Sequence, residues 1–467
     1  MVKLVKGQTF EAEVVSAGFE GVGVARVDDL VVFIRGAVPG DRVLARVRKA
    51  KRRYAEAGVE ALLRPSPRRV EPVCRYFQVC GGCSWQNAHY QLQLEFKREQ
   101  VRDLLSRIGG LSDLEVSPLL GSPRLYHYRN KMEFTFGARR WLTQEEIAAS
   151  GPVPKEFALG LHVPQRFDKV LDIEICHLGA PIMPEIVNLV RQIAKDNCWA
   201  PYDTITHEGY LKNLVVRVSE HTGEILVNLV TSERRPDRMA NLANELTSRF
   251  PSVRSVVNSI NPGRSPVALG KEVTDFGPGD LIEKIGPVSY RLEASTFFQP
   301  NTLQAERLYG VVRDFARLFG NETLLDLYCG IGGITLFLAG GVKRAIGVES
   351  QARAVELARL NAETNSIGNC EFLESDAAGY LRHLAEKASF VPDVVTIDPP
   401  RAGMHPDMLG SLLRLKPGRI VYVSCNPATQ ARDLQALANG YEVDGVQPVD
   451  MFPQTYHIEN VVGLRRR

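Results

Sequence analysis

The chain has 467 residues, 44% of them hydrophobic and 24% charged, with a formal net charge of +3. This length exceeds the usual size of one hydrophobic core, so we expect two or three domains of ordinary globular composition. No apolar run of about eighteen residues is present, and the first residues lack a signal-peptide core. These features predict a cytosolic protein that is not embedded in a membrane.

Residues 1–62 alternate short β-rich runs with glycine turns, which is typical of a small barrel of the OB type. The expected strands cover residues 10–15, 21–27, 30–34 and 42–47. The last strand leads into a basic run made of Arg46, Arg48, Lys49, Lys51, Arg52 and Arg53. Such a run could contact phosphates or could simply be solvated, and the residues alone favour neither interpretation. The arrangement resembles the TRAM domain, an RNA-binding module.

Three cysteines, Cys74, Cys80 and Cys83, follow within a single short segment that also contains two glycines. Clustered cysteines in a cytosolic chain indicate metal binding, and Cys176 is the natural fourth ligand. A zinc ion or an iron–sulfur cluster would satisfy this set, and the neighbouring His177 keeps a mixed zinc site open. We therefore expect a structural metal. The remaining thiols outside the sites are expected to be packed in the interior: Cys198, Cys329 and Cys370.

The metal site is expected in a central α+β domain that covers residues 63–290. Two of its strands, 213–218 and 224–230, could pair as a hairpin. A polar loop with two aromatics, residues 295–301, follows this domain and precedes an amphipathic helix over 303–318. Gln299 lies in that loop, which could cap an adenine or a flipped base.

The stretch 324–333 reads as a buried strand that turns tightly into a helix. Its turn holds glycines where a backbone must approach a ligand, and the next strand, 345–348, ends in Glu349, an acidic residue suited to ribose hydroxyls. The GxGxxG spacing of dinucleotide folds is absent. Asp326 before the turn is similar to the first motif of S-adenosylmethionine methyltransferases, although a plain strand-to-helix turn would give the same pattern.

Three further strands are expected to bring side chains to the same sheet edge. Asp376 follows the third strand, Asp398 ends the fourth in an Asp-Pro-Pro-Arg segment, and Cys425 lies at the tip of the fifth. A thiolate that adds to carbon 6 of a pyrimidine makes carbon 5 nucleophilic enough to accept a methyl group. The carbon 5 proton must then leave, and Glu459 is the candidate base. Taken singly, Cys425 could be a packed strand-end thiol and Glu459 a surface carboxylate.

Three segments together, residues 398–403, 420–429 and 450–459, resemble the paired signatures of the RNA uracil-5 methyltransferase family. The resemblance implies Cys425 as nucleophile and Glu459 as base, in a C-terminal Rossmann-like domain over 291–467. It implies contacts to S-adenosylmethionine from five residues. They are Gln299, Tyr328, Glu349, Asp376 and Asp398. Some members carry a polar residue where this chain has Gly333.

The same resemblance implies a 4Fe-4S cluster on Cys74, Cys80, Cys83 and Cys176. It also implies an RNA partner, with 23S ribosomal RNA favoured over tRNA because the TRAM-like barrel and the cluster are both present. We expect a monomer that flips the target uridine out of folded RNA. Two rival interpretations are a methyltransferase that acts on another base and a noncatalytic iron–sulfur RNA-binding protein.

Overall fold

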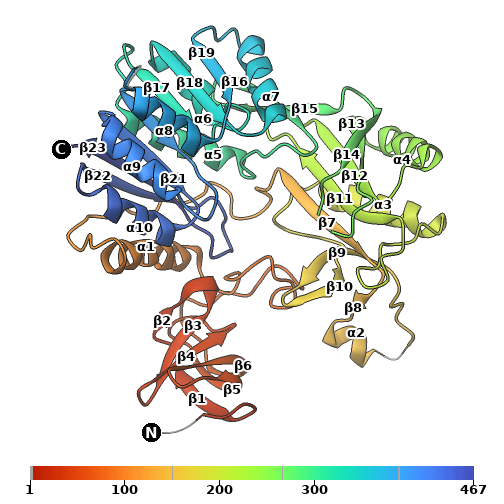
Figure 1. The fold of residues 1–467 in the computed structure, drawn as a ribbon. Helices are drawn as coiled ribbons and strands as arrows, with labels where there is room; N and C mark the ends of the chain where they lie inside the picture. The colour runs from red at the N-terminus through yellow and green to blue at the C-terminus, as the bar shows by residue number, and fades with distance from the viewer. Residues whose placement is uncertain (1–3, 150, 266, 388–389) are drawn as a thin grey trace.

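The computed structural model describes residues 4–149, 151–265, 267–387 and 390–467. Figure 1 shows three parts: a small red barrel at the N-terminus, a yellow and green central sheet with its helices, and a cyan and blue sheet at the C-terminus. Among the residues that the structure describes, no helix combines the length and the apolar character needed to cross a membrane.

The N-terminal barrel is a six-stranded sheet with the order β1-β5-β6-β4-β3-β2. Alternate residues of its strands point inward, so Val43, Ala45 and Val47 of β5 are buried while the residues between them face outward. The last strand continues to Arg64, slightly beyond the predicted end of the domain. The elements are β1 (Thr9–Glu13), β2 (Ser16–Ala17), η1 (Phe19–Gly21), β3 (Gly23–Val27), β4 (Leu30–Arg35), β5 (Arg42–Ala50) and β6 (Tyr54–Arg64).

The central part is an eight-stranded mixed sheet, with the order β14-β13-β12-β11-β7-β9-β10-β8. Helices α3 and α4 bury their apolar faces against it. The predicted hairpin is confirmed, because β11 and β12 pair antiparallel. The elements are β7 (Lys131–Gly137), β8 (Arg140–Trp141), α2 (Gln144–Ala148), β9 (Ala158–Val163), β10 (Arg166–Asp172), α3 (Met183–Asp196), β11 (Leu211–Val218), β12 (Ile225–Thr231), α4 (Pro236–Arg249), β13 (Val253–Ile260) and β14 (Lys271–Phe276).

The C-terminal sheet has seven strands in the order β19-β18-β17-β20-β21-β23-β22, and among them only β23 runs against the others. Strand order reverses beside β17, which is where doubly wound folds bind ligands. The elements are α5 (Thr302–Ala316), β17 (Thr323–Leu327), α6 (Gly333–Leu338), η2 (Ala339–Gly341), β18 (Arg344–Glu349), α7 (Ala352–Thr364), β19 (Cys370–Glu374), α8 (Ala377–Lys387), β20 (Val394–Ile397), α9 (Pro406–Leu415), β21 (Arg419–Ser424), α10 (Pro427–Leu437), β22 (Tyr441–Val449) and β23 (Glu459–Arg466).

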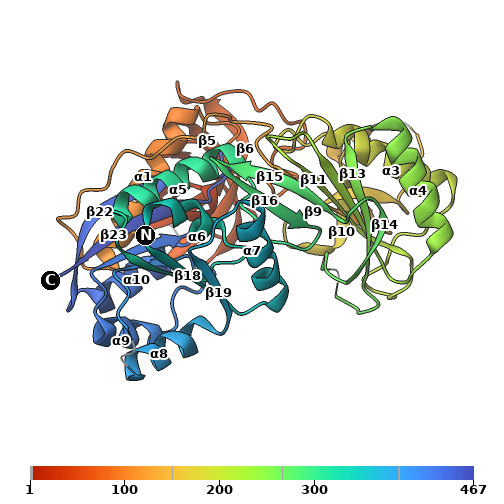
Figure 2. The same cartoon turned by 90° about the horizontal axis from the view of Figure 1, so that it is seen from above.

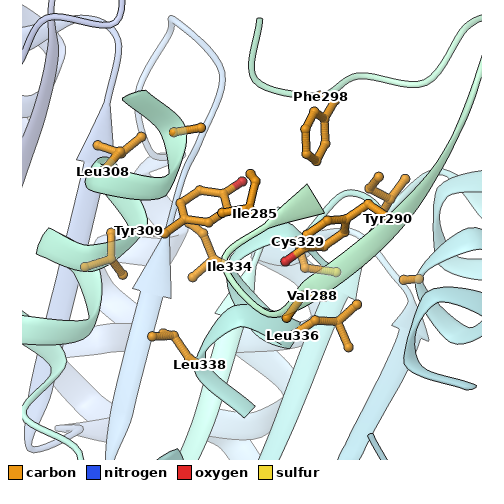
Figure 3. Packing of buried hydrophobic residues seen from close by; sticks show 14 of the residues in the cluster. Ile285, Val288, Tyr290, Phe298, Leu308, Tyr309, Cys329, Ile334, Leu336 and Leu338 are labelled. Carbon is orange, nitrogen blue, oxygen red and sulfur yellow. The ribbon is translucent and has the colours of Figure 1, made fainter. Parts of the chain in front are cut away.

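A helix and a hairpin, which the sequence assigned wholly or partly to the central domain, pack instead on the C-terminal sheet. Helix α1 (Tyr90–Arg107) buries Val101 and Leu105 in the same hydrophobic cluster as β21 and α10, and Figure 1 shows it beneath α10. The hairpin of β15 (Asp280–Ile285) and β16 (Val288–Glu293) joins the core on the other face. Figure 2 shows this hairpin between the two sheets, and Figure 3 shows Tyr290 beside Cys329 in this core. The expected boundary at residue 290 therefore falls inside an element of the C-terminal core.

Candidate active site and cysteine cavity

The turn between β17 and α6 has an uncommon backbone conformation. Tyr328, Gly330 and Gly332 all have positive φ angles, of 64°, 54° and 85°. A Cβ added at Gly330 would meet no atom within 4 Å, so protein packing does not require a glycine there. The left-handed backbone favours glycine, and the open space lets a ligand approach the main chain. This is the conformation expected of a cofactor-binding turn.

Asp326 fixes this turn from beneath. Its carboxylate is buried and accepts hydrogen bonds from Thr335 Oγ1 of α6 (2.5 Å) and Thr396 Oγ1 of β20 (2.7 Å). Burial raises the pKa of Asp326 to about 6, and the two hydroxyls oppose that rise. Asp326 therefore ties two strands and a helix together, and Thr335 and Thr396 were missed because hydroxyls at these positions carry no sequence signal.

Gly333 has a packing reason to be glycine. A Cβ there would lie 2.6 Å from the hydroxyl oxygen of Tyr309, and the carbonyl of Gly333 accepts a hydrogen bond from Tyr290 Oη (2.9 Å). A polar side chain at this position would displace the buried Tyr309. Some family members carry a polar residue at this position, and in this chain Tyr309 fills the space that such a side chain would need.

Glu349 is the last residue of β18, and its side chain contacts the turn. Its carboxylate accepts hydrogen bonds from the backbone N–H groups of Gly330 (3.2 Å), Ser350 (2.8 Å) and Gln351 (2.9 Å). The side chain remains half-buried rather than enclosed. Glu349 is therefore oriented by main-chain donors beside the open turn, as a ribose-binding carboxylate would need to be.

The strand register brings the predicted residues to one edge. Leu327 pairs with Val348 and Ile397, and Ile397 pairs with Tyr422, so β17, β18, β20 and β21 end at nearly the same level. Tyr328, Asp398 and Cys425 directly follow β17, β20 and β21, and Glu349 is the last residue of β18. The predicted position of Asp398 and Cys425 at one carboxyl edge of the sheet is therefore observed.

Asp398 is a carboxyl group in an acidic environment. Burial, with a smaller contribution from the Asp326 carboxylate, raises its pKa to about 7. Its backbone N–H faces the carbonyl of Leu327 at 3.5 Å, which keeps it next to the β17 turn. A cation bound next to Asp398 would stabilise the ionised carboxylate and lower this pKa.

Cys425 and Glu459 lie close enough to influence each other's charge. Burial, then Glu459 and Asp398, raise the pKa of the Cys425 thiol to about 11, while Arg401 opposes that rise. Glu459 begins β23, is buried, and has a pKa well above its usual range because of burial and Asp398. The alternative of a surface carboxylate at 459 is thus excluded, and Arg401 emerges as the cation shared by both groups.

Two of the predicted donor-binding residues share a pocket. Tyr328 and Asp376 line an open pocket of about 710 Å³ between the β17 turn, the start of α8 and residues 402–409. Asp376 Oδ2 also accepts the backbone N–H of Gly379 (2.7 Å). Gln299 is placed by its backbone, whose carbonyl accepts from Asn130 Nδ2 (2.9 Å), beside Phe298 of the core that contains the turn. Gln299, Glu349 and Asp398 are not among that pocket's lining residues.

The four predicted metal-binding cysteines line one cavity of about 450 Å³. Its walls also include Arg129 and Phe297. Cys80 Sγ accepts the N–H of Gly82 (3.4 Å), and Cys83 Sγ accepts from Gln86 Nε2 (3.2 Å). Burial raises the pKa of the Cys80 thiol to about 11 and that of Cys83 to about 12. Across the described residues, no three His, Cys, Asp or Glu side chains are grouped closely enough to hold a metal ion.

The other cysteines differ in exposure. Cys329 is buried and Cys370 half-buried, as expected of packed thiols. Cys198 is exposed, so the expectation for it was wrong. It lies two residues beyond the end of α3 with a φ of 52°, so it belongs to the turn that leaves the helix rather than to the buried face of the helix.

The doubly wound sheet, the glycine turn and the acidic edge define an S-adenosylmethionine-dependent methyltransferase. The family model described as tRNA (uracil-5-)-methyltransferase matches residues 219–467, and the TRAM domain model matches residues 3–59. The chain belongs to this RNA uracil-5 methyltransferase family, with a TRAM domain at its N-terminus.

Similar proteins extend over almost the whole chain. An uncharacterized RNA methyltransferase of Chlorobaculum tepidum is 43% identical over 93% of this chain and 91% of its own length. Another, of Bacteroides thetaiotaomicron, is 41% identical over 96% of this chain and 99% of its own. The crystal structure of Pyrococcus abyssi tRNA (uracil-54, C5)-methyltransferase with S-adenosyl-L-homocysteine has 28% identity and a TM-score of 0.76, covering 97% of this chain and all of that one.

Proposed function

We propose that this enzyme methylates carbon 5 of a uridine through a covalent bond between Cys425 and carbon 6. The observation that supports this most directly is the shared environment of Cys425, Glu459 and Asp398, whose charges act on one another at the carboxyl edge of the sheet. An enzyme that methylates an exocyclic amine has no need for a thiol beside a buried carboxyl group. A noncatalytic protein has no need to bury Glu459, since burying a carboxyl group costs free energy.

In the proposed reaction, the Cys425 thiol gives its proton to solvent and its sulfur bonds to carbon 6 of the uracil. The electrons of the carbon 5–carbon 6 double bond move onto carbon 5 and oxygen 4. Carbon 5 then bonds to the methyl group of S-adenosylmethionine, whose sulfur–methyl bond breaks, and S-adenosylhomocysteine leaves. The ionised Glu459 takes the proton from carbon 5. The double bond re-forms, the carbon–sulfur bond breaks, and Cys425 is released as a thiolate.

Positive charge in the site favours the reactive form of the thiol. The resting thiol is protonated because its pKa is about 11. Arg401 lowers the pKa values of both Cys425 and Glu459, and the cationic donor would add charge of the same sign. Donor binding would therefore increase the thiolate fraction of Cys425 and the ionised fraction of Glu459 together. The residues proposed to surround the donor are Gln299, Tyr328, Glu349, Asp376 and Asp398.

We further propose that Cys74, Cys80, Cys83 and Cys176 bind a 4Fe-4S cluster. Four thiols around one cavity, two of which accept N–H donors, match the ligand set of such a cluster. Each thiolate of a cluster binds a different iron, so this site does not require three ligands grouped around one ion. The cluster's proposed role is to hold the RNA-binding face, without a change of redox state in turnover.

The proposed substrate is 23S ribosomal RNA, with tRNA as the second candidate. The presence of the barrel and of the four clustered cysteines favours 23S ribosomal RNA. The second is favoured by the Pyrococcus abyssi enzyme, a tRNA methyltransferase whose structure matches 97% of this chain, including the barrel. The domain architecture therefore does not distinguish between a ribosomal RNA substrate and a tRNA substrate, so the test includes both RNAs.

The test is mass spectrometry of the protein after incubation with S-adenosylmethionine and 5-fluorouridine-substituted transcripts of 23S rRNA or tRNA. Fluorine at carbon 5 cannot leave as a proton, so a covalent adduct on Cys425 is expected with the true substrate. Cys198→Ser, at an exposed thiol remote in sequence from the proposed site residues, is the matched control and should still form the adduct. Methylation of unsubstituted RNA without any adduct on the substituted RNA would disprove the thiolate mechanism.

A further inference from the structure

Four aromatic side chains form a continuous strip from the barrel to the catalytic groups. The ring centroids of Phe19 and Tyr456 are 5.6 Å apart, those of Tyr456 and His457 4.3 Å, and those of His457 and Phe452 5.7 Å. We call Phe19, Tyr456, His457 and Phe452 the aromatic strip. It joins η1 of the barrel to the loop that leads into Glu459, so it is formed by two segments from opposite ends of the chain.

The inner end of the strip lies at the catalytic pair. His457 Nδ1 is 3.5 Å from Arg401 Nη2, and Arg401 is the cation that acts on both Cys425 and Glu459. The Arg129 guanidinium lies 5.5 Å from the centre of the Phe452 ring. The strip is therefore flanked by two cations next to the place where the uridine reacts.

The outer end of the strip is open to solvent. Phe19 is 64% exposed, whereas Tyr456, His457 and Phe452 are half-buried. An exposed phenylalanine on a short turn contributes little to the barrel core, which it does not join. Burial, with Arg401 and Arg129, lowers the pKa of His457 to about 4, so its ring is neutral at physiological pH. An exposed phenylalanine beside partly exposed, neutral rings suits an aromatic partner.

The loop that carries three of these rings is held rigidly. The carbonyl of Gln454 accepts the backbone N–H groups of Ser84 (2.8 Å) and Trp85 (3.1 Å), and Gln93 Nε2 donates to Gln454 Oε1 (3.0 Å). Tyr456 packs against a buried cluster that includes Trp85 and Phe96. A rigid surface loses little conformational entropy when a ligand binds to it.

We propose that the aromatic strip is a stacking platform for the unpaired nucleobases that flank the target uridine. This proposal rests on the proposed function. Every nucleobase has a π-face that stacks on aromatic side chains, and flanking cations match the phosphates of the same strand. The strip would hold the strand that runs from the barrel to Cys425 while the target base enters the site.

The test compares RNA binding by the wild type, Phe19→Ala and Phe19→Trp over a range of salt concentrations. The probes are a single-stranded oligouridine and an unmodified 23S rRNA transcript. Loss of one stacked base predicts roughly 5- to 100-fold weaker binding for Phe19→Ala. Because no charge is removed, the slope of affinity against salt should stay unchanged, and Phe19→Trp should retain binding. Phe319→Ala is the matched control, since Phe319 is 83% exposed near the opposite, amino-terminal end of β17.

Equal affinity of Phe19→Ala and the wild type for both probes would overturn the proposal, as would a loss that appears only as a changed salt slope. The thermal transition of each variant should match that of the wild type, because Phe19 lies outside the barrel core. If no Cys425 adduct forms but Phe19→Ala still weakens oligouridine binding, the proposed function fails and the platform stands. If the wild type forms the Cys425 adduct but Phe19→Ala binds RNA as the wild type does, the proposed function stands and the stacking platform is wrong.

Discussion

At the residue scale, the most informative single change is Glu459→Gln. The amide keeps the shape of the buried carboxyl group but cannot accept the carbon 5 proton, so methyl transfer should proceed and release should stall. We expect turnover to fall by roughly 10²- to 10⁴-fold. A slowly migrating protein–RNA adduct that contains methylated uridine should accumulate on denaturing gels with ordinary RNA. Glu363→Gln, at an exposed carboxylate of α7, should behave as the wild type. Normal turnover by Glu459→Gln would remove this residue from the proposed base role.

At the element scale, helix α1 is attached to the loop before Glu459 by a buried ion pair. Lys97 Nζ lies 2.6 Å from Asp450 Oδ1, both side chains are fully buried, and Tyr90 Oη donates to the other carboxylate oxygen (2.8 Å). Lys97→Met would leave the Asp450 charge unpaired, which should lower the free energy of unfolding by about 3–5 kcal/mol in denaturant titrations. Lys97→Met with Asp450→Leu should recover most of this loss. Arg102→Met, on the same helix in an exposed pair with Glu99, should change stability by less than about 1 kcal/mol. A Lys97→Met protein as stable as the wild type would contradict this account.

At the scale of the whole molecule, the barrel should contribute electrostatic RNA binding. Deleting the barrel is a poor test, because Val38 and Ala17 cover Trp85 and its buried cluster. Replacing Lys51, Arg52 and Arg53, the exposed turn between β5 and β6, by alanine removes only charge. For single-stranded RNA, the slope of log affinity against log salt should fall by roughly 2, while donor binding measured by calorimetry stays unchanged. The paired variant Arg313→Ala/Lys343→Ala, at exposed positions of the other domain, should leave the slope unaltered. An unchanged slope in the triple variant would assign RNA binding to another surface.

The local patterns of the sequence predicted much of this architecture. Short β-rich runs separated by glycine turns predicted the barrel strands, and the apolar run before Gly330 predicted the strand-to-helix turn that the structure contains. Helix α1 could not be assigned to its partner in this way. The apolar positions of α1 show that one of its faces is buried. They do not show that this face packs against α10 rather than against the central sheet, which is nearer in the sequence. That choice depends on side-chain fit between segments far apart in the chain.

The sequence by itself determined the strands and the carboxyl edge that carries Asp398 and Cys425, because short-range periodicity and spacing encode them, and the resemblance of residues 398–403, 420–429 and 450–459 indicated the family. Only the tertiary structure decided that Glu459 is buried, that Thr335 and Thr396 hold Asp326, and that Phe19 meets Tyr456. Burial and ring contacts arise when separate elements pack together, and no local pattern of residues specifies which distant side chain will occupy the space.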